Sequence, residues 1–264
     1  MLTKYRLNQC LLLTSVGVYV GNFVLFAGTA QPTLPGRASH FLLATAALHY
    51  LLNLVHIGSH NLLSRKRKWN SILGNIAGFF GGVTFADFRL THLRHHRYLD
   101  DPREDPDYFI TNSGPWFTIP FKIFYHDVFF FRRGLYRSQH SWRGYVLTRL
   151  AQVLTVSLLL TFGLKSSWIT LWLTPMLLLG LCNGLFLFYF PHYIPRIEKS
   201  WRTKPRVWNA PARLLIDISR VFHERHHDRI QNNLNYYPLL AAFCYLYRHG
   251  HWRFTLHHDY TRTV

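Results

Sequence analysis

The chain has 264 residues, of which 49% are hydrophobic, and a formal net charge of +18. Soluble domains rarely combine so large an apolar fraction with so large a charge, so the composition argues against a soluble globular protein. It predicts apolar segments that cross a bilayer and basic segments beside the lipid headgroups. The 17 histidines are also well beyond ordinary usage, and many of them recur at fixed spacings.

Two predicted transmembrane helices lie near the N-terminus. Residues 10–30 are apolar and uncharged, and about twenty such residues cross a bilayer as a helix. We interpret this segment as retained, because the apolar core of a cleaved signal peptide usually runs for only about 7–15 residues. A turn rich in proline and glycine, residues 31–37, leads to the second predicted span, residues 38–58. The end of that span carries His56 and reaches towards His60.

The middle of the chain contains shorter and more polar segments. Residues 71–86 are apolar but short and rich in glycine, and we interpret them as a re-entrant or interfacial arm. We expect the helix that leaves this arm to carry the next histidines. Residues 108–143 alternate aromatic and basic side chains. This pattern is typical of an amphipathic segment in the headgroup layer, and we expect these residues to lie there. With these membrane segments on either side, we expect no nucleic-acid partner.

Two further apolar spans are predicted at residues 144–162 and 168–190, joined by a short turn with Lys165. Thirteen lysines and arginines lie between residues 59 and 143 and twelve lie from 191 onward, whereas the turns between paired spans hold one each. This bias predicts that both termini and the middle segment are cytoplasmic. The sequence therefore predicts an all-α, multi-pass membrane protein: a single domain over all 264 residues with about four transmembrane helices and a cytoplasmic helical cap.

Histidines recur in three groups at the predicted cytoplasmic ends of these spans. The pattern His-x-x-His-His occurs at 92–96 and again at 223–227, and His-x-x-x-His occurs at 56–60. Residues at i, i+3 and i+4 face one way on a helix, so each group can converge on one site. Imidazole is a common ligand of iron, zinc and copper. Together with a histidine at the end of the last span, the candidate ligands suit two ions: His56, His60, His92, His95, His96, His192, His223, His226 and His227.

Acidic residues gather behind these histidines. The chain has 12 of them, and five lie between residues 100 and 107. Ligating histidines usually donate their second N–H to a carboxylate or a carbonyl. The predicted carboxylate partners are Asp101, Asp105, Asp107, Glu224 and Asp228. His126, followed by Asp127, is interpreted as structural or interfacial. The remaining histidines are predicted not to bind metal: His40, His49, His140, His249, His251, His257 and His258.

The three histidine groups, the run HLRHHRYLDDPREDPD and the order of spans resemble the membrane fatty acid desaturase superfamily, with its related hydroxylases and carotenoid ketolases. The resemblance extends from about residue 45 to 240. It implies two irons held by histidines, activation of O2, electrons from a ferredoxin or cytochrome b5 type donor, and attack on an unactivated C–H bond. Carried over by position, the eight histidines of the three groups would be ligands, and His192 matches a further histidine that many members place after their last span.

These features predict a di-iron oxidoreductase that acts on a lipid hydrocarbon chain, with an acyl-lipid fatty acid desaturase as the first interpretation. Its active site would face the cytoplasm, in a bacterial inner membrane or the endoplasmic reticulum. A lipid or carotenoid hydroxylase or ketolase is the alternative, because the polar run 228–233 replaces the short apolar stretch that desaturases often place after the last group.

Two other classes fit the sequence less well. His223-Glu224-x-x-His227 matches the zinc peptidase pattern His-Glu-x-x-His, with Glu224 as base. The hypothesis of an intramembrane peptidase, however, does not explain why the same His-x-x-His-His pattern also occurs at residues 92–96. A metal transporter should place its ligands at mid-membrane, whereas these histidines are predicted to gather at one face.

Overall fold

The structure, a computed structural model, describes residues 4–29, 33–112, 115–122, 125–137 and 139–186. Within these residues every regular element is a helix and none is a strand, which confirms the predicted all-α class. The elements in chain order are α1 (Lys4–Gly28), α2 (Leu34–Ser59), α3 (Arg67–Phe80), α4 (Phe85–Arg97), α5 (Pro106–Asn112), η1 (Trp116–Thr118), α6 (Ile119–Lys122), α7 (Tyr125–Arg132), η2 (Leu135–Arg137), α8 (Gln139–Thr161), α9 (Lys165–Trp168), η3 (Ile169–Leu173) and α10 (Thr174–Asn183).

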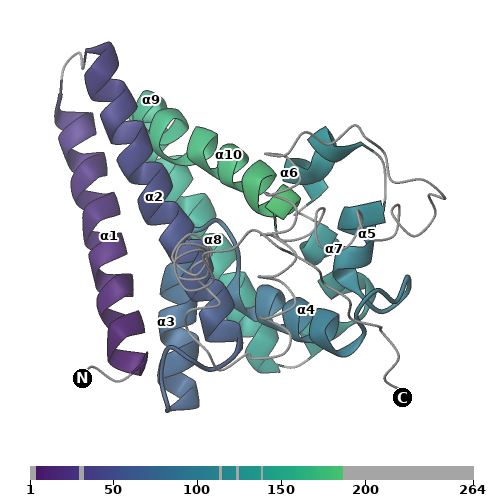
Figure 1. The fold of residues 1–264 in the computed structure, drawn as a ribbon. Helices are drawn as coiled ribbons and strands as arrows, with labels where there is room; N and C mark the ends of the chain where they lie inside the picture. The colour runs from purple at the N-terminus through teal and green to yellow at the C-terminus, as the bar shows by residue number, and fades with distance from the viewer. Residues whose placement is uncertain (1–3, 30–32, 113–114, 123–124, 138, 187–264) are drawn as a thin grey trace, which may run out of the picture.

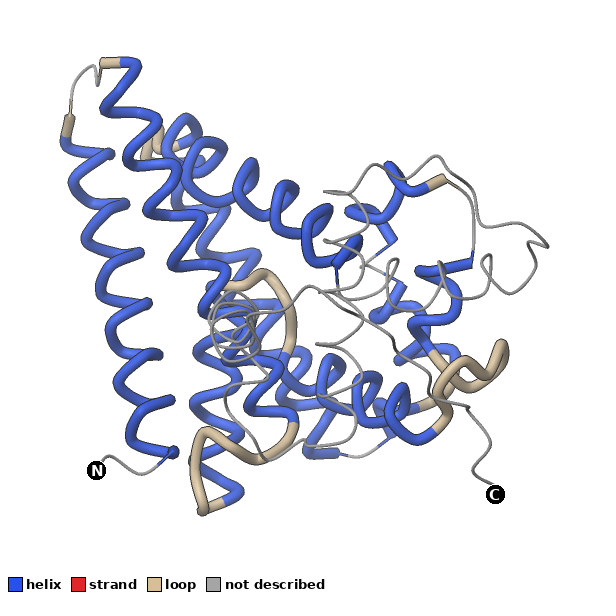
Figure 2. Tube along the Cα trace, viewed as in Figure 1, coloured by secondary structure: helices blue, strands red, loops and turns tan. Residues whose placement is uncertain are grey.

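Within the described residues, four helical segments are long and apolar enough to cross a membrane, in agreement with the four predicted spans. They are α1, α2, Ser141–Thr161 of α8, and the run Lys165–Phe186 through α9, η3 and α10. α2 begins after Thr33, whose hydroxyl oxygen accepts the N–H of Gly36 at 3.3 Å and so caps the helix. Figures 1 and 2 show α1 and α2 as an antiparallel pair, with the N-terminal end of α1 near the end of α2. The last part of the fourth predicted span, residues 187–190, lies outside the described residues.

α2 lies at the centre of the bundle, where it packs against α1, α3, α4 and α10. Its core residues, such as Leu51, are completely buried. Polar side chains reinforce the pair that it forms with α1. Asn8 donates from Nδ2 to the carbonyl of Leu62 at 2.8 Å, and Asn22 donates to the carbonyl of His40 at 2.9 Å. Such hydrogen bonds are a common means of joining helices inside a bilayer, and here they fix both ends of α2.

α3 and α4 are joined by a sharp bend of 103° (Figure 1). In the turn, Gly82 has a φ of +65°, which glycine adopts without a steric penalty. A Cβ on Gly74 would lie 2.5 Å from Cδ2 of Phe85, so the glycine surface of α3 lets the first residue of α4 pack directly on it. Four charged residues along α4 make a straight crossing of the membrane costly: Asp87, Arg89, Arg94 and Arg97. The bend falls inside the predicted arm, residues 71–86, and α4 is the helix that leaves it with the next histidines.

Side chains from α8 and η3 hold this bend in place. Arg149 donates to the carbonyl of Gly82 at 2.9 Å, and Gln152 donates to the carbonyls of Gly78 and Phe79, in the last turn of α3, at 3.3 Å each. From the π-helical turn η3, Trp172 donates its indole N–H to the carbonyl of Phe80 at 2.8 Å. Carbonyl groups left without donors are costly in an apolar environment, so these bonds stabilise the bend and thereby place α4.

The short helices α5 and α7 lie against α4, and α6 lies beside the end of α10 (Figure 1). α7 is fastened to α8, because Asp127 accepts two hydrogen bonds from Arg149, at 2.9 and 2.6 Å. Phe130 of α7 is completely buried and stacks on Tyr145 of α8 with ring centroids 5.3 Å apart. Phe121 of α6 is 66% exposed, which suits the headgroup position predicted for this part of the chain.

Candidate metal centre

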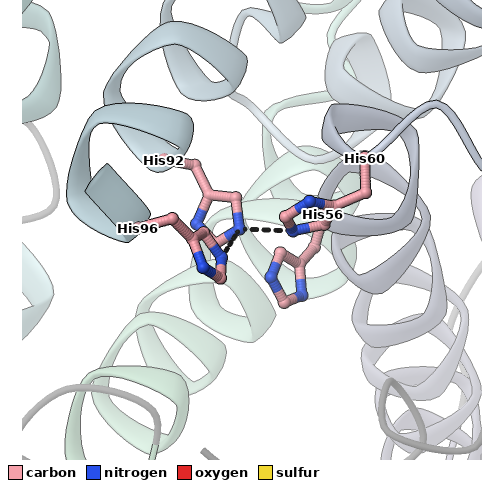
Figure 3. Close-up of side chains that lie close together, drawn as sticks. All are labelled: His56, His60, His92 and His96. Atoms are coloured by element: carbon pink, nitrogen blue, oxygen red, sulfur yellow. Dashed lines mark hydrogen bonds between the residues drawn. The ribbon is translucent and has the colours of Figure 1, made fainter. Parts of the chain in front are cut away.

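Four histidines from two helices meet below the centre of the bundle. His56 lies in the last turn of α2 and His60 directly follows that helix, while His92 and His96 lie one turn apart on α4. One ring nitrogen from each histidine can be chosen so that all four nitrogens lie within 4.8 Å of one another. Figure 3 shows the four rings directed towards one another from the two helices. The predicted convergence of two distant histidine groups is therefore present in the described part of the chain.

The distances within this four-histidine cluster suit one metal ion. Nε2 of His92 lies 2.9 Å from Nε2 of His60 and 3.0 Å from Nε2 of His96. Nitrogen ligands at about 2.1 Å from an ion, placed at right angles, lie about 3 Å apart. The ring of His56 completes the group, with its centroid 4.4 Å from that of His92. The ring nitrogens thus already have the spacing of ligands around a single ion.

The protonation of these side chains also suits metal binding, because an imidazole must be neutral to act as a ligand. Burial, together with the neighbouring charges of His96 and Arg89, lowers the pKa of His60 to about 3. Burial, with the charge of His95, lowers the pKa of His96 to about 4. Both rings are therefore neutral at physiological pH and have lone pairs to offer.

His95 belongs to the same sequence group but is held apart from the other four. Its ring centroid is 6.3 Å from that of His92 and 5.8 Å from that of His96. Adjacent residues on a helix point about 100° apart, so His95 and His96 cannot face the same way. The three histidines of residues 92–96, predicted to face one site that suits two ions, therefore divide into two sets. Two of them join the four-histidine cluster, and His95 lies beside it.

Two carboxylates lie close to Nδ1, one of the two ring nitrogens of His95. Its Nδ1 lies 2.9 Å from Oδ1 of Asp105 and 3.3 Å from Oδ2 of Asp107, and the histidine side chain is only 1% exposed. Burial alone would lower the pKa of His95, but the charge of Asp107 and the hydrogen bond and charge of Asp105 together raise it. The same negative charges that favour a proton on Nε2 would favour a metal ion there. This is the arrangement expected of a ligand that a carboxylate orients.

The predicted carboxylate partners are distributed unevenly in the structure. Asp105 and Asp107 contact His95, as described above. Asp101 instead accepts the backbone N–H groups of Arg103 at 2.8 Å and Glu104 at 2.9 Å, so it shapes the loop before α5. An aspartate two or three residues before free backbone N–H groups often forms such a turn, and this local use competes with contact to a histidine.

One residue of the site was not identified from the sequence. His126, predicted to be structural or interfacial, comes from α7 and places Nε2 at 2.7 Å from Oδ1 of Asp107. Burial would lower the pKa of His126, but its hydrogen bond to Asp107 and the charge of that carboxylate outweigh burial and raise it. A lone histidine has no spacing to mark it, and only the adjacent Asp127 could have drawn attention to this position.

The remaining predicted residues are accounted for as follows. The ring of His40 is hydrogen-bonded to Asn22 at 2.6 Å, and the ring of His49 is hydrogen-bonded to Asn53 at 3.0 Å. Neither histidine belongs to the four-histidine cluster. Six predicted site residues lie outside the described residues: His192, His223, Glu224, His226, His227 and Asp228.

Comparison with known proteins identifies the family. The sequence model of the family described as "Fatty acid desaturase" matches residues 32–255, which include all three histidine groups and most of the chain. Neither the curated proteins nor the solved structures give a match. A match of this extent favours an oxidoreductase over a zinc peptidase. With its membrane-spanning helices and clustered histidines, the chain belongs to the fatty acid desaturase family of membrane oxidoreductases.

Proposed function

We propose that this protein is an O2-dependent di-iron oxidoreductase that acts on the hydrocarbon chain of a membrane lipid, and that its reaction is desaturation of a lipid-linked acyl chain. The observation that carries this proposal is the cluster of four imidazoles at the end of a transmembrane helix, in a chain of the desaturase family. A ligand set of nitrogens without thiolates suits iron, zinc or copper, and the family favours iron.

The ligands divide into two sets under this proposal. His56, His60, His92 and His96 would hold one iron, because their nitrogens already have the spacing of ligands. His95 faces away from that set and would serve the second iron. The histidines of the C-terminal part of the chain would complete both sites: His192, His223, His226 and His227. When bound, the two irons supply the activation of O2 that removal of hydrogen from an unactivated carbon requires.

The protein side chains would control access to the site and its geometry. Phe88 stacks on the ring of His92 with centroids 5.5 Å apart and lies edge-on to His56 at 6.3 Å. An apolar ring in this position keeps water away from one side of the ligands, which protects the reaction from side products. Desaturation removes two hydrogens from neighbouring carbons, and O2 takes them up with two electrons and two protons as two molecules of water.

The electrons must come from a separate protein, and we propose an acidic donor of the ferredoxin or cytochrome b5 type. Exposed basic residues begin five positions after His60, in the run Arg65 to Lys68, which extends from the link after α2 into the start of α3. The net charge of +18 would attract a negatively charged partner to this side. The distribution of lysine and arginine described above supports a cytoplasmic position for the site and for this partner.

A lipid or carotenoid hydroxylase or ketolase is the second candidate. The observation in its favour is the polar run 228–233 directly after the last histidine group. Both reactions need the same ligands and differ in where the substrate carbon lies relative to the irons.

Lipid profiling of a host cell tests the proposal. Cells that express the wild-type chain should gain a double bond in an acyl lipid, and cells that express His96→Ala should not. His40→Ala is the matched control, since that histidine is bonded to Asn22 away from the cluster, and it should behave as wild type. A product heavier by one oxygen would identify the hydroxylase instead. An unchanged lipid profile together with purified protein that contains zinc and no iron would overturn the proposal.

A further inference from the structure

Asp107 connects two histidines that come from different helices. Its Oδ2 lies 3.3 Å from Nδ1 of His95 on α4, and its Oδ1 lies 2.7 Å from Nε2 of His126 on α7. The side chains of His95, Asp107 and His126 are 1%, 4% and 8% exposed, respectively. A carboxylate oxygen only accepts hydrogen bonds, so Nε2 of His126 carries a hydrogen and donates it to Asp107. Buried polar contacts of this kind hold their groups in one orientation.

The two carboxylates beside His95 are oriented by different parts of the protein. Asp105 accepts the backbone N–H groups of Asp100 at 2.8 Å and of Asp107 at 2.9 Å, so its own loop fixes it. Asp107 accepts a side-chain hydrogen bond from His126, which lies 19 residues further along the chain. The orientation of the Asp105 carboxylate is therefore fixed by its own loop, and that of the Asp107 carboxylate by the packing of α7.

The helix that carries His126 is itself fixed to a transmembrane span. Asp127 of α7 accepts two hydrogen bonds from Arg149 of α8, and Phe130 is buried against Tyr145. His126 is thus held by α8 through α7, whereas Asp107 lies in the first turn of α5. The position of this imidazole can determine where the Asp107 carboxylate lies.

We propose that His126 is a positioning residue for metal binding: its Nε2–H holds Asp107 against Nδ1 of His95, which sets the direction in which His95 presents Nε2. This proposal rests on the proposed function, in which His95 is a ligand of the second iron. In this role His126 would act through Asp107 and His95 and would not itself be a ligand. Removal of such an outer contact typically weakens metal affinity by about 10- to 100-fold.

Three substitutions separate positioning from packing. His126→Phe keeps an aromatic ring beside Phe88, whose centroid is 6.3 Å from that of His126, but it removes the hydrogen-bond donor. His126→Gln places an amide N–H close to the original Nε2. His126→Asn carries the same amide on a side chain one carbon shorter, which withdraws it from Asp107. A positioning role predicts that Gln restores metal binding and that Phe and Asn do not.

The experiment is an anaerobic titration of the purified, full-length, metal-free protein with Fe2+ against a competing chelator. In wild type we expect two ions per chain. In His126→Phe and His126→Asn the affinity for one ion should fall by about 10- to 100-fold while the other stays unchanged. His126→Gln should lie within about threefold of wild type, since it retains the donor. His40→Phe, the same change at a histidine remote from the cluster, should bind both ions normally.

Several results would overturn the positioning role. Wild-type affinity for both ions in His126→Phe would do so, as would equal losses in His126→Gln and His126→Asn. If His126→Phe does not fold, the Gln and Asn pair carries the comparison alone. The proposed function is judged separately, because a wild-type protein that binds two Fe2+ ions but leaves lipids unchanged would refute the reaction and not the role of His126.

Discussion

Nε2 of His60 lies 2.9 Å from Nε2 of His92, although 32 residues separate these histidines in the chain. The contact joins the end of a membrane-spanning helix to a helix that follows the α3–α4 bend. Since α8 and η3 hold that bend, the spacing of the two nitrogens depends on packing at some distance from the ligands. The metal centre should therefore respond both to loss of a ligand and to changes that move α4.

Loss of a ligand gives the most direct prediction. His92 lies within hydrogen-bonding distance of two other histidines of the cluster, so His92→Ala removes its central nitrogen. We expect bound iron to fall by about one ion per chain and turnover to stop, while the protein still inserts into the membrane. Metal analysis of the detergent-purified protein and lipid profiling measure the two effects. Full iron content together with full activity in this variant would rule out the cluster as a ligand set.

A change at the α3–α4 contact should disturb the site without touching a ligand. A Cβ on Gly74 would lie 2.5 Å from the ring of Phe85, so Gly74→Ala must push α4 away from α3. We expect a loss of about 1–3 kcal/mol in unfolding free energy and weaker retention of iron. Thermal unfolding and metal analysis measure these effects. Gly17→Ala in α1 is the control, because nothing lies within 4 Å of its Cβ position. Equal behaviour of the two variants would contradict the proposed role of this contact.

The sequence predicted the spans and the paired histidines because both follow from local periodicity. Apolar runs of about twenty residues identify spans, and histidines four residues apart on a helix share a face. The separation of His95 from His96 also follows from helical geometry, but which of them faces His60 depends on how α4 lies against α2. That placement comes from the bend at Gly82 and from its contacts with α8.

The contact between Asp107 and His126 could not be predicted in the same way. It joins α5 and α7 across an irregular segment, and 19 residues separate its two partners. No repeat or spacing relates them, so only the tertiary packing of α7 brings them together. The same holds for Asp127, whose partner Arg149 is a charged residue inside a predicted span. From the sequence alone, His126 is therefore interpreted as structural or interfacial.

The ion pair of Asp127 and Arg149 should contribute to stability as well as to the placement of α7. The two side chains are 21% and 27% exposed, and Arg149 also donates to the carbonyl of Gly82. Arg149→Met leaves the carboxylate and the carbonyl without these donors, and we expect a loss of about 1–3 kcal/mol. The double variant Arg149→Met, Asp127→Leu should recover part of that loss, since no unpaired carboxylate remains. Thermal unfolding of the two variants in the same detergent decides this, and no recovery in the double variant would count against the ion pair.

The basic run after α2 should govern the encounter with the electron donor. Lys66 and Lys68 are exposed and follow His60 by six and eight residues, so a negatively charged donor would approach the metal centre across them. We expect the donor to reduce the double variant Lys66→Glu, Lys68→Glu at least about tenfold more slowly than it reduces wild type at low salt. This difference in rate should shrink as salt is raised. Arg37→Glu reverses an exposed charge at the opposite end of α2 and should have little effect on this rate. Stopped-flow reduction by an acidic ferredoxin or cytochrome b5 measures it. A wild-type rate that does not change between low and high salt would exclude electrostatic attraction as the basis of this encounter.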